Sequence, residues 1–257
     1  MRFCVLASGS GGNCVWAEHG GAAILVDNGL PLSDFRRRAS SRGLDAGRLI
    51  AVLLTHEHGD HMNGVGPVCL KYGVRVHTSR RTLAAGKSKG PLAGVPFSEF
   101  GPWGTAEMGP FTVSSFPAPH DTEDPQVFVL RAGGSALGVA TDMGMLADCI
   151  LENFKGLTGA VIEFNHDQAM LRDGPYPNFL KARVKGPNGH LSNDQGAEFL
   201  AKVNHPGLKC VVLGHLSAKN NDPKLALAAA KKALAGGPGK PLLAVADQHA
   251  PTKVFDI

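Results

Sequence analysis

Short apolar runs separated by Gly, Pro and polar residues recur along the chain, and runs of this length are typical of β-strands. They begin at Phe3, Ala22, Leu49, Val74, Phe111, Val127, Ala136, Ala160 and Cys210, and a last one, KVFDI, ends the sequence. In CVWAEHGGAAILV (residues 14–26) two such runs flank a pair of glycines, which predicts a β-hairpin. The preceding SGSGGN (residues 8–13) lacks the Lys-Ser/Thr ending of a phosphate loop, which favours a tight turn between strands.

Helical patterns separate several of these runs. They cover residues 32–43, 192–204 and 222–237. Ser192 and Gln195 stand at capping-box spacing, and Asp222 followed by Pro223 is a typical helix start. No repeat, heptad pattern or linker divides the chain. We therefore expect one mixed α/β domain over residues 1–257.

Composition narrows the class of protein only slightly. The 257 residues are 43% hydrophobic, enough for one large core, and the formal charge of +4 permits a polyanionic partner without requiring one. The five cysteines are scattered without a C-x-x-C pair, which argues against a disulfide framework or a thiolate zinc site. No run reaches membrane-spanning length, and the N-terminus is a poor signal peptide. We expect a soluble cytoplasmic protein without a membrane partner; its oligomeric state is not encoded in any recognisable pattern.

Potential metal ligands follow the ends of four strand-like runs. THEHGDH (residues 55–61) places three His and one Asp directly after LIAVLL, and later runs lead into His120, Asp142 and His215. In layered α/β folds, side chains at one end of the strands converge from distant segments. The candidate ligands are His56, His58, Asp60, His61, His120, Asp142 and His215. Five imidazoles and two carboxylates suit two divalent ions, zinc first, with manganese or iron as alternatives.

The spacing within the first motif suggests how the ligands divide. His56 and His58 are two residues apart at a strand end, so they can share one ion. Asp60 and His61 open the following helix and can serve a second ion nearby. Asp142 is a natural bridge because a carboxylate has two oxygens. A water held between the ions loses a proton near neutral pH, and this hydroxide is the expected nucleophile.

These residues resemble the metallo-β-lactamase superfamily, whose H-x-H-x-D-H motif matches residues 56–61 in full. The resemblance implies an α-β-β-α sandwich, with two mixed sheets flanked by helices and the metals in a cleft at one end. It assigns His56, His58 and His120 to the first ion, Asp60, His61 and His215 to the second, and Asp142 to both. It also implies that Asp27, which ends ILVD, orients the site without binding metal.

A narrower resemblance extends along almost the whole chain. LASGSGGNC, FNHDQAML, GPYPNFLKARV, GHLSN and HLSAKNN are similar to the YycJ (WalJ) subfamily, which is associated with 5′-to-3′ exonuclease action on double-stranded DNA. The sequence therefore predicts a metal-dependent phosphodiesterase, with DNA as its substrate. The alternative is a small-molecule hydrolase of ester, thioester, lactone or β-lactam bonds, because the same metal motif serves those reactions.

Residues outside the ligand set are also candidates. Asp60 and His190 are the candidate catalytic residues. For His190, which lies in GHLSN, the resemblance favours the role of a proton donor to the leaving oxygen. The alternative is that His190 is an ordinary loop residue before the Ser192 cap. Asn165, His166 and Asp167 follow a strand, as the ligands do. They either support the ligands or form a capped turn.

Substrate contacts are expected from a basic segment and from the N-terminal turn. Lys181, Arg183 and Lys185 lead into His190, and phosphate contacts from them would make binding strongly salt-dependent. The alternative is an ordinary basic surface loop. Ser10 and Asn13 belong to the turn that the resemblance places beside the cleft.

Overall fold

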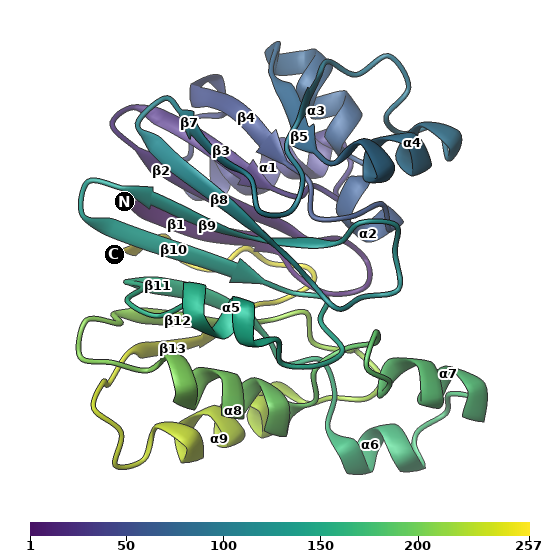
Figure 1. Ribbon diagram of the computed structural model, residues 1–257, viewed down its shortest axis with the longest axis vertical. Coiled ribbons are helices and arrows are strands. Elements are labelled where there is room, and N and C mark those ends of the chain that lie inside the picture. The colour runs from purple at the N-terminus through teal and green to yellow at the C-terminus, as the bar shows by residue number, and fades with distance from the viewer.

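Two β-sheets packed face to face form the centre of the protein (Figure 1). The computed structural model describes residues 1–257. The first sheet has the strand order β14-β1-β2-β3-β4-β5-β6, and the second has the order β13-β12-β11-β10-β9-β8-β7. The strands of the first sheet are β1 (Arg2–Ala7), β2 (Cys14–His19), β3 (Ala22–Val26), β4 (Leu49–Leu53), β5 (Arg75–Thr78), β6 (Phe97–Glu99) and β14 (Phe255–Asp256). Those of the second are β7 (Thr105–Met108), β8 (Phe111–Pro117), β9 (Gln126–Ala132), β10 (Ser135–Ala140), β11 (Gly159–Glu163), β12 (Cys210–Gly214) and β13 (Leu242–Val245).

The alternation of side chains along each strand divides the apolar residues between layers. In β1, Phe3 and Val5 join a cluster that lies between the two sheets, whereas Cys4 and Leu6 join a cluster under the helices. A third cluster lies between the second sheet and its own helices. Three apolar layers require four layers of structure. This is the α-β-β-α sandwich of two mixed sheets that the sequence predicts.

Helices cover the outer face of each sheet and cluster at one end of the sandwich (Figure 1). Over the first sheet lie α1 (Leu32–Ser41), α3 (Val65–Tyr72) and α4 (Arg80–Ser88). Over the second lie α5 (Asp148–Asn153), α8 (Asn193–Val203) and α9 (Pro223–Leu234). The remaining helices are η1 (Ala46–Arg48), α2 (Gly59–Met62), α6 (Gln168–Asp173) and α7 (Asn178–Val184). None of the helices is both long and apolar enough to cross a membrane.

Most of the expected elements are present, and the helix starts agree in detail. The capping box of Ser192 and Gln195 opens α8, and Asp222 caps α9 with Pro223 in its first turn. The basic segment around Lys181, for which a surface loop is the alternative interpretation, forms α7. Only Val184 of this helix is buried, so it carries no apolar periodicity by which a helix could be predicted. The pattern also misses α3 and α4.

Parallel pairing brings the functional ends of the second sheet together. Strands β10, β11 and β12 are parallel neighbours, and Glu163 at the end of β11 pairs with Gly214 at the end of β12. The carboxyl ends of these strands are therefore level. Asp142, Glu163 and His215 emerge from adjacent strands at one edge, where α2, α6 and α7 also gather (Figure 1).

Three residues at strand ends adopt the left-handed backbone conformation that non-glycine residues rarely take. They are Asp27 (φ 59°), Asp142 (φ 61°) and His215 (φ 55°), and all three are polar residues of the converging edge. Such conformations cost about 1–3 kcal/mol each and persist where the surroundings enforce them, most often at functional sites. The backbone turns sharply at the points where these side chains must face one another.

Candidate metal centre

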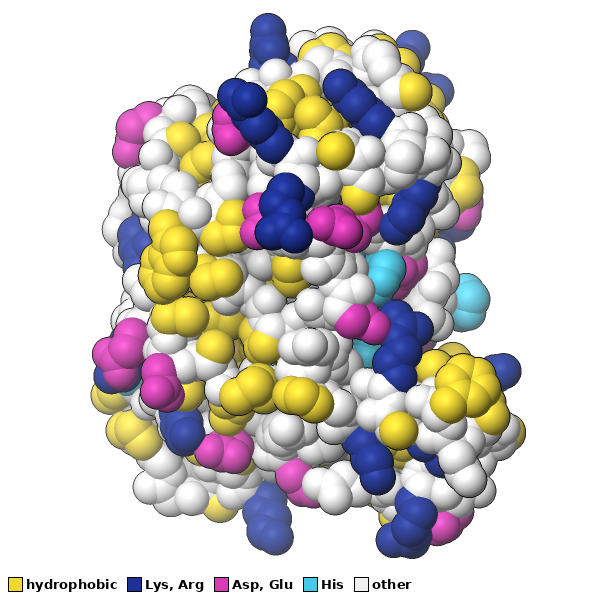
Figure 2. Space-filling model, turned by 45° about the vertical axis from the view of Figure 1, so that its right-hand side comes forward, with side chains coloured by type: hydrophobic (Ala, Val, Ile, Leu, Met, Phe, Trp, Pro, Cys, Tyr) yellow, Lys and Arg dark blue, Asp and Glu magenta, His cyan; other side chains and the backbone are white.

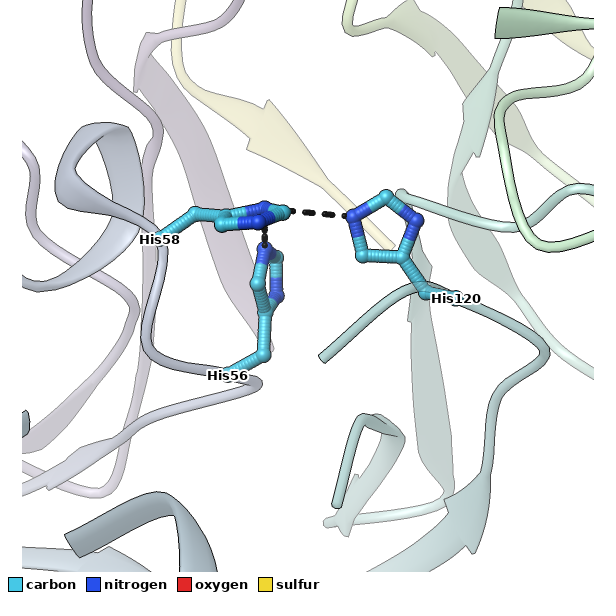
Figure 3. Close-up of side chains that lie close together, drawn as sticks. All are labelled: His56, His58 and His120. Carbon is cyan, nitrogen blue, oxygen red and sulfur yellow. Dashed lines mark hydrogen bonds between the residues drawn. The ribbon is translucent and has the colours of Figure 1, made fainter. Parts of the chain in front are cut away.

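Three imidazoles meet at the edge of the sandwich (Figure 3). His56 follows β4, His58 is the residue before α2, and His120 follows β8 in the other sheet. The Nε2 of His56 lies 3.1 Å from the Nδ1 of His58, and the Nε2 of His120 lies 3.2 Å from the same Nδ1. Figure 3 shows the rings of His56 and His58 on one side and that of His120 opposite them, with their nitrogens turned toward one another.

The Nδ1 of His56 forms a hydrogen bond that fixes the tautomer of the ring. The Thr55 hydroxyl donates to Asp27 Oδ2 at 2.9 Å, so its oxygen is left to accept from His56 Nδ1, also at 2.9 Å. The proton of His56 therefore resides on Nδ1. Its Nε2 carries a lone pair that faces the other two rings.

The same reasoning applies to His120 and leaves a place for a cation. His120 Nδ1 donates to the Gly189 carbonyl at 3.0 Å, so the Nε2 of His120 also carries a lone pair. Both lone pairs face His58 Nδ1, which can donate at most one proton. Hydrogen bonds among the three rings can therefore satisfy only one of the two lone pairs, whereas a metal ion can bind one nitrogen of each ring.

A second cluster lies next to the first. The Nε2 atoms of His61 and His215 lie 3.5 Å and 3.4 Å from Asp60 Oδ2. Their outer nitrogens face carboxylates: His61 Nδ1 is 2.8 Å from Asp27 Oδ2, and His215 Nδ1 is 3.2 Å from Glu163 Oε1. Both Nδ1 atoms therefore donate outward, and both Nε2 atoms turn toward Asp60. Two imidazoles and a carboxylate of this kind form a second ligand set.

Asp142 lies between the two clusters and touches both. Its Oδ2 is 3.1 Å from His61 Nε2, and its Oδ1 is 3.6 Å from His215 Nε2 and 3.8 Å from His120 Nε2. The residue is only 2% exposed, yet Oδ2 makes no hydrogen bond. A buried carboxylate oxygen without a hydrogen bond is costly unless a cation lies beside it. The residues present therefore fit two divalent ions with one shared carboxylate.

Comparison with known proteins agrees with this geometry. Residues 7–194 match the metallo-β-lactamase superfamily. The chain belongs to this superfamily. Membership makes the protein a metal-dependent hydrolase, and its clusters of His and Asp are those of a divalent-metal site.

Relatives within the superfamily match most of the chain. Exodeoxyribonuclease WalJ of Streptococcus pneumoniae is 34% identical over 229 residues, which are 88% of this chain and 85% of that protein. Exodeoxyribonuclease YycJ of Bacillus anthracis is 32% identical over 88% of this chain and 86% of its own. The metallo-β-lactamase-fold protein YhfI of Bacillus subtilis superposes with a TM-score of 0.74 over 99% of both chains at 14% identity. The resemblance to the YycJ (WalJ) subfamily is confirmed.

Glu163 is a residue of this metallo-β-lactamase site that the sequence prediction missed. It is fully buried at the end of β11, where its Oε1 accepts from His190 Nδ1 at 2.8 Å and from His215 Nδ1 at 3.2 Å. Its Oε2 accepts from the Met143 amide at 2.8 Å. The sequence contained one indication of it, because an acidic residue ends the strand that lies between the strands leading to Asp142 and His215.

The two clusters differ in their electrostatics. Burial and nearby imidazoles lower the pKa of His56 well below its usual value and that of His58 to about 4. Burial also opposes the protonation of His215, but Asp142, Asp60 and Glu163 outweigh it and raise the pKa of His215 to about 10. The pKa of His61 is raised well above its usual value, against burial, by the carboxylates around it.

These opposite shifts predict that the two ions are lost at different pH. Metal must displace protons from His61 and His215, whose pKa values are raised, whereas the lowered pKa values of His56 and His58 leave little competition from protons at the other cluster. We expect metal content after dialysis to fall from two ions toward one as the pH is lowered below about 10, and the remaining ion to be lost only as the pH approaches about 4. Calorimetry in buffers of different ionisation enthalpy should show proton release with the weaker ion. Simultaneous loss of both ions would contradict the difference.

The predicted supporting residues lie at different depths in the site. Asn165 donates to the His215 carbonyl at 2.8 Å, so it fixes the backbone of that residue. Asp167 caps α6 by accepting from the Met170 amide at 2.9 Å. His166 is buried and lines a separate pocket.

The N-terminal turn contributes one buried and one exposed residue. Asn13 is 5% exposed, and its Nδ2 donates to Asp60 Oδ2 at 3.2 Å, so it positions that carboxylate. Ser10 is exposed at the tip of the turn. Of the two, only Ser10 is free to contact a substrate without displacing a buried contact.

His190 lies at the opening of the site. Its ring is 5.2 Å from those of both His120 and His215, and its Nδ1 lies 2.8 Å from Glu163 Oε1 and 3.4 Å from Asp142 Oδ1. The side chain is 21% exposed, more than any other imidazole it touches. It is therefore a solvent-accessible imidazole backed by a buried carboxylate.

Helix α7 distributes its basic residues between two surfaces. Arg183 donates to Asp121 Oδ2 at 2.5 Å, and Asp121 follows His120, so Arg183 borders the metal centre. Lys181 and Lys185, two residues to either side, line the separate pocket instead. Phe179, one turn before Arg183, is 76% exposed.

Proposed function

We propose that this protein is an exonuclease that degrades double-stranded DNA in the 5′-to-3′ direction with two divalent metal ions. The observation that carries the proposal is the match, over 88% of the chain, to relatives named exodeoxyribonucleases. The paired ligand clusters supply the chemistry that phosphodiester hydrolysis needs. We also propose that the protein acts in the cytoplasm, where a DNA substrate would be present.

The ligand chemistry favours zinc, with manganese or iron as alternatives. We assign the first ion to His56, His58 and His120, the second to Asp60, His61 and His215, and both to Asp142. Imidazole-rich sets with one or two carboxylates suit ions of borderline softness. When bound, the ions supply Lewis-acid charge to a phosphoryl group and a hydroxide nucleophile near neutral pH.

Residues of the chain perform the remaining steps. Asn13 and Asp27 hold Asp60 and His61 in orientation. His190 donates a proton to the leaving oxygen, since it is accessible and its Nδ1 is held by Glu163. Burial opposes the charge of Glu163, but His190 and His215 lower the pKa of its carboxyl to about 2, so it stays ionised and stabilises the imidazolium.

The face around the centre suits a polyanion. Figure 2 shows histidine side chains on this face, with Asp and Glu side chains next to them and Lys and Arg side chains above and below. Arg183 borders the centre beside an exposed aromatic ring, Phe179. An exposed ring next to a cation is a common platform for nucleobases.

The proposal predicts degradation of labelled duplex DNA by the purified protein. With zinc, manganese or iron added to chelator-treated protein, we expect mononucleotides to accumulate from an end-labelled duplex while a closed circular duplex stays intact. A label at the 5′ end should be released before an internal one. Hydrolysis of chromogenic esters, thioesters or lactams with DNA left intact would instead establish a small-molecule hydrolase.

A further inference from the structure

A separate pocket lies beside the metal centre, between α6, α7 and the start of α8. Its cavity measures about 750 Å³. We call it the α6–α8 pocket; it is lined by His166, Gln168, Leu171, Arg172, Lys181 and Lys185, together with Asn178, Ala182, Ser192 and Gln195. Only two of these ten residues are hydrophobic. An apolar acyl group or a stacked base would find little to bind here.

The charge on the pocket wall has one sign. Three of its residues, Arg172, Lys181 and Lys185, are cationic, and none is a carboxylate. Arg172 pairs with Asp173 on the surface, and Lys181 donates to the Arg172 carbonyl at 2.7 Å. Lys185 forms no ion pair or hydrogen bond through its side chain. The wall therefore holds cationic charge that the protein itself does not neutralise.

A buried imidazole points to a ligand independently of these surface cations. His166 is 2% exposed and lines the pocket, yet its Nδ1 has no hydrogen-bond partner. Nδ1 itself has almost no accessible surface, so a ligand in the pocket meets the ring at Nε2, which forms no hydrogen bond within the protein and can donate one to an anion. At the start of α8, the amides of Ser192 and Gln195 are occupied by the capping box, and the Asn193 amide donates to the His166 carbonyl.

The pocket is separated from the candidate metal centre by only two residues of chain. His190 faces the metal ligands and Ser192 lines the pocket, and two residues of extended chain span at most about 7 Å. Successive phosphates of one DNA strand advance about 3.4 Å along the helix axis. A strand whose scissile phosphate lies in the metal centre thus has another phosphate within reach of Lys181 and Lys185.

We propose that the α6–α8 pocket binds a backbone phosphate of the DNA strand, one to a few nucleotides from the bond that is cleaved. The inference rests on the proposed function for the identity of the strand. It separates the basic residues of α7 by role: Lys181 and Lys185 hold this phosphate with His166, while Arg183 serves the metal centre. The pocket contributes to DNA binding and to the position of the strand relative to the cleaved bond, and not to the chemical step.

The test is the binding of duplex DNA to metal-free protein, which needs no catalysis. We compare wild-type protein, the Lys181→Gln/Lys185→Gln variant, His166→Ala, and a matched control, Lys231→Gln/Lys232→Gln, which removes the same charge from exposed positions of α9. For the pocket double variant we expect a Kd at least about tenfold higher at 0.1 M salt, and a slope of log K against log salt shallower by about 2. His166→Ala should weaken binding in the same direction, and the control should match wild type.

The outcomes separate this inference from the proposed function. If wild-type protein degrades DNA but the pocket variants bind it as the control does, the pocket inference is wrong and the exonuclease stands. If wild-type protein binds DNA through the pocket without degrading it, the inference holds and the proposed function fails. Titration with inorganic phosphate, followed by NMR of the His166 ring, distinguishes the source: a shift with phosphate but no effect of the variants on DNA binding would identify a free-phosphate site and overturn the inference.

Discussion

Replacing His58 by alanine is expected to abolish DNA degradation, with a loss of about 10³-fold or more. His58 Nδ1 is the point on which the Nε2 atoms of His56 and His120 converge, at 3.1 and 3.2 Å, so its removal opens the first ligand set. A bound ion contributes several kcal/mol of transition-state stabilisation, and each 1.36 kcal/mol is a factor of ten in rate. Release of labelled nucleotides at saturating zinc or manganese measures the loss.

A matched substitution controls for the removal of an imidazole. His19 lies at the far end of β2 from the site, so His19→Ala should retain wild-type activity and two ions per chain. His58→Ala should retain the fold, because its side chain is half-buried at the rim and belongs to none of the apolar clusters. Metal analysis should show one tightly bound ion fewer. Full nuclease activity in His58→Ala would remove the first ligand set from the mechanism.

The sequence predicted the fold and the position of the site because both depend on local patterns. Alternating apolar residues mark strands whatever their partners are, and the spacing in HEHGDH places four ligands within a single turn. His120, Asp142 and His215 could be added because each follows a strand end. Their convergence then needs only the rule that strand ends meet at one edge of a layered fold.

The roles of other residues depend on contacts between distant segments, which the local sequence does not reveal. The tautomer of His120 is fixed by the Gly189 carbonyl, a backbone group 69 residues away. Glu163 ends an otherwise apolar strand, and its role is visible only once His190 and His215 are seen to share its Oε1. The separation of Lys181 from Arg183 follows from α7 being a helix, which an exposed segment without apolar periodicity does not reveal.

Replacing His190 by glutamine is expected to slow DNA cleavage by about 10²- to 10⁴-fold, the usual contribution of a general acid. Gln retains a polar side chain of similar reach but cannot release a proton. The effect should fall on kcat, because His190 lies beside the candidate metal ligands His120 and His215 and does not line the α6–α8 pocket. Single-turnover release of labelled nucleotides by the wild type and the variant measures the loss.

The leaving group distinguishes proton donation from a structural role. An activated diester such as bis(p-nitrophenyl) phosphate expels a stable anion and needs little protonation, so His190→Gln should slow it far less than DNA. Glu163→Gln should slow both substrates, because Glu163 also holds His215 Nδ1 at 3.2 Å, and loss of such a ligand support weakens metal binding by about 10- to 100-fold. Excess zinc should therefore restore part of the activity of Glu163→Gln but none of that of His190→Gln. Equal losses on both substrates for His190→Gln, or its rescue by metal, would show that His190 maintains the metal centre and that the proton comes from elsewhere.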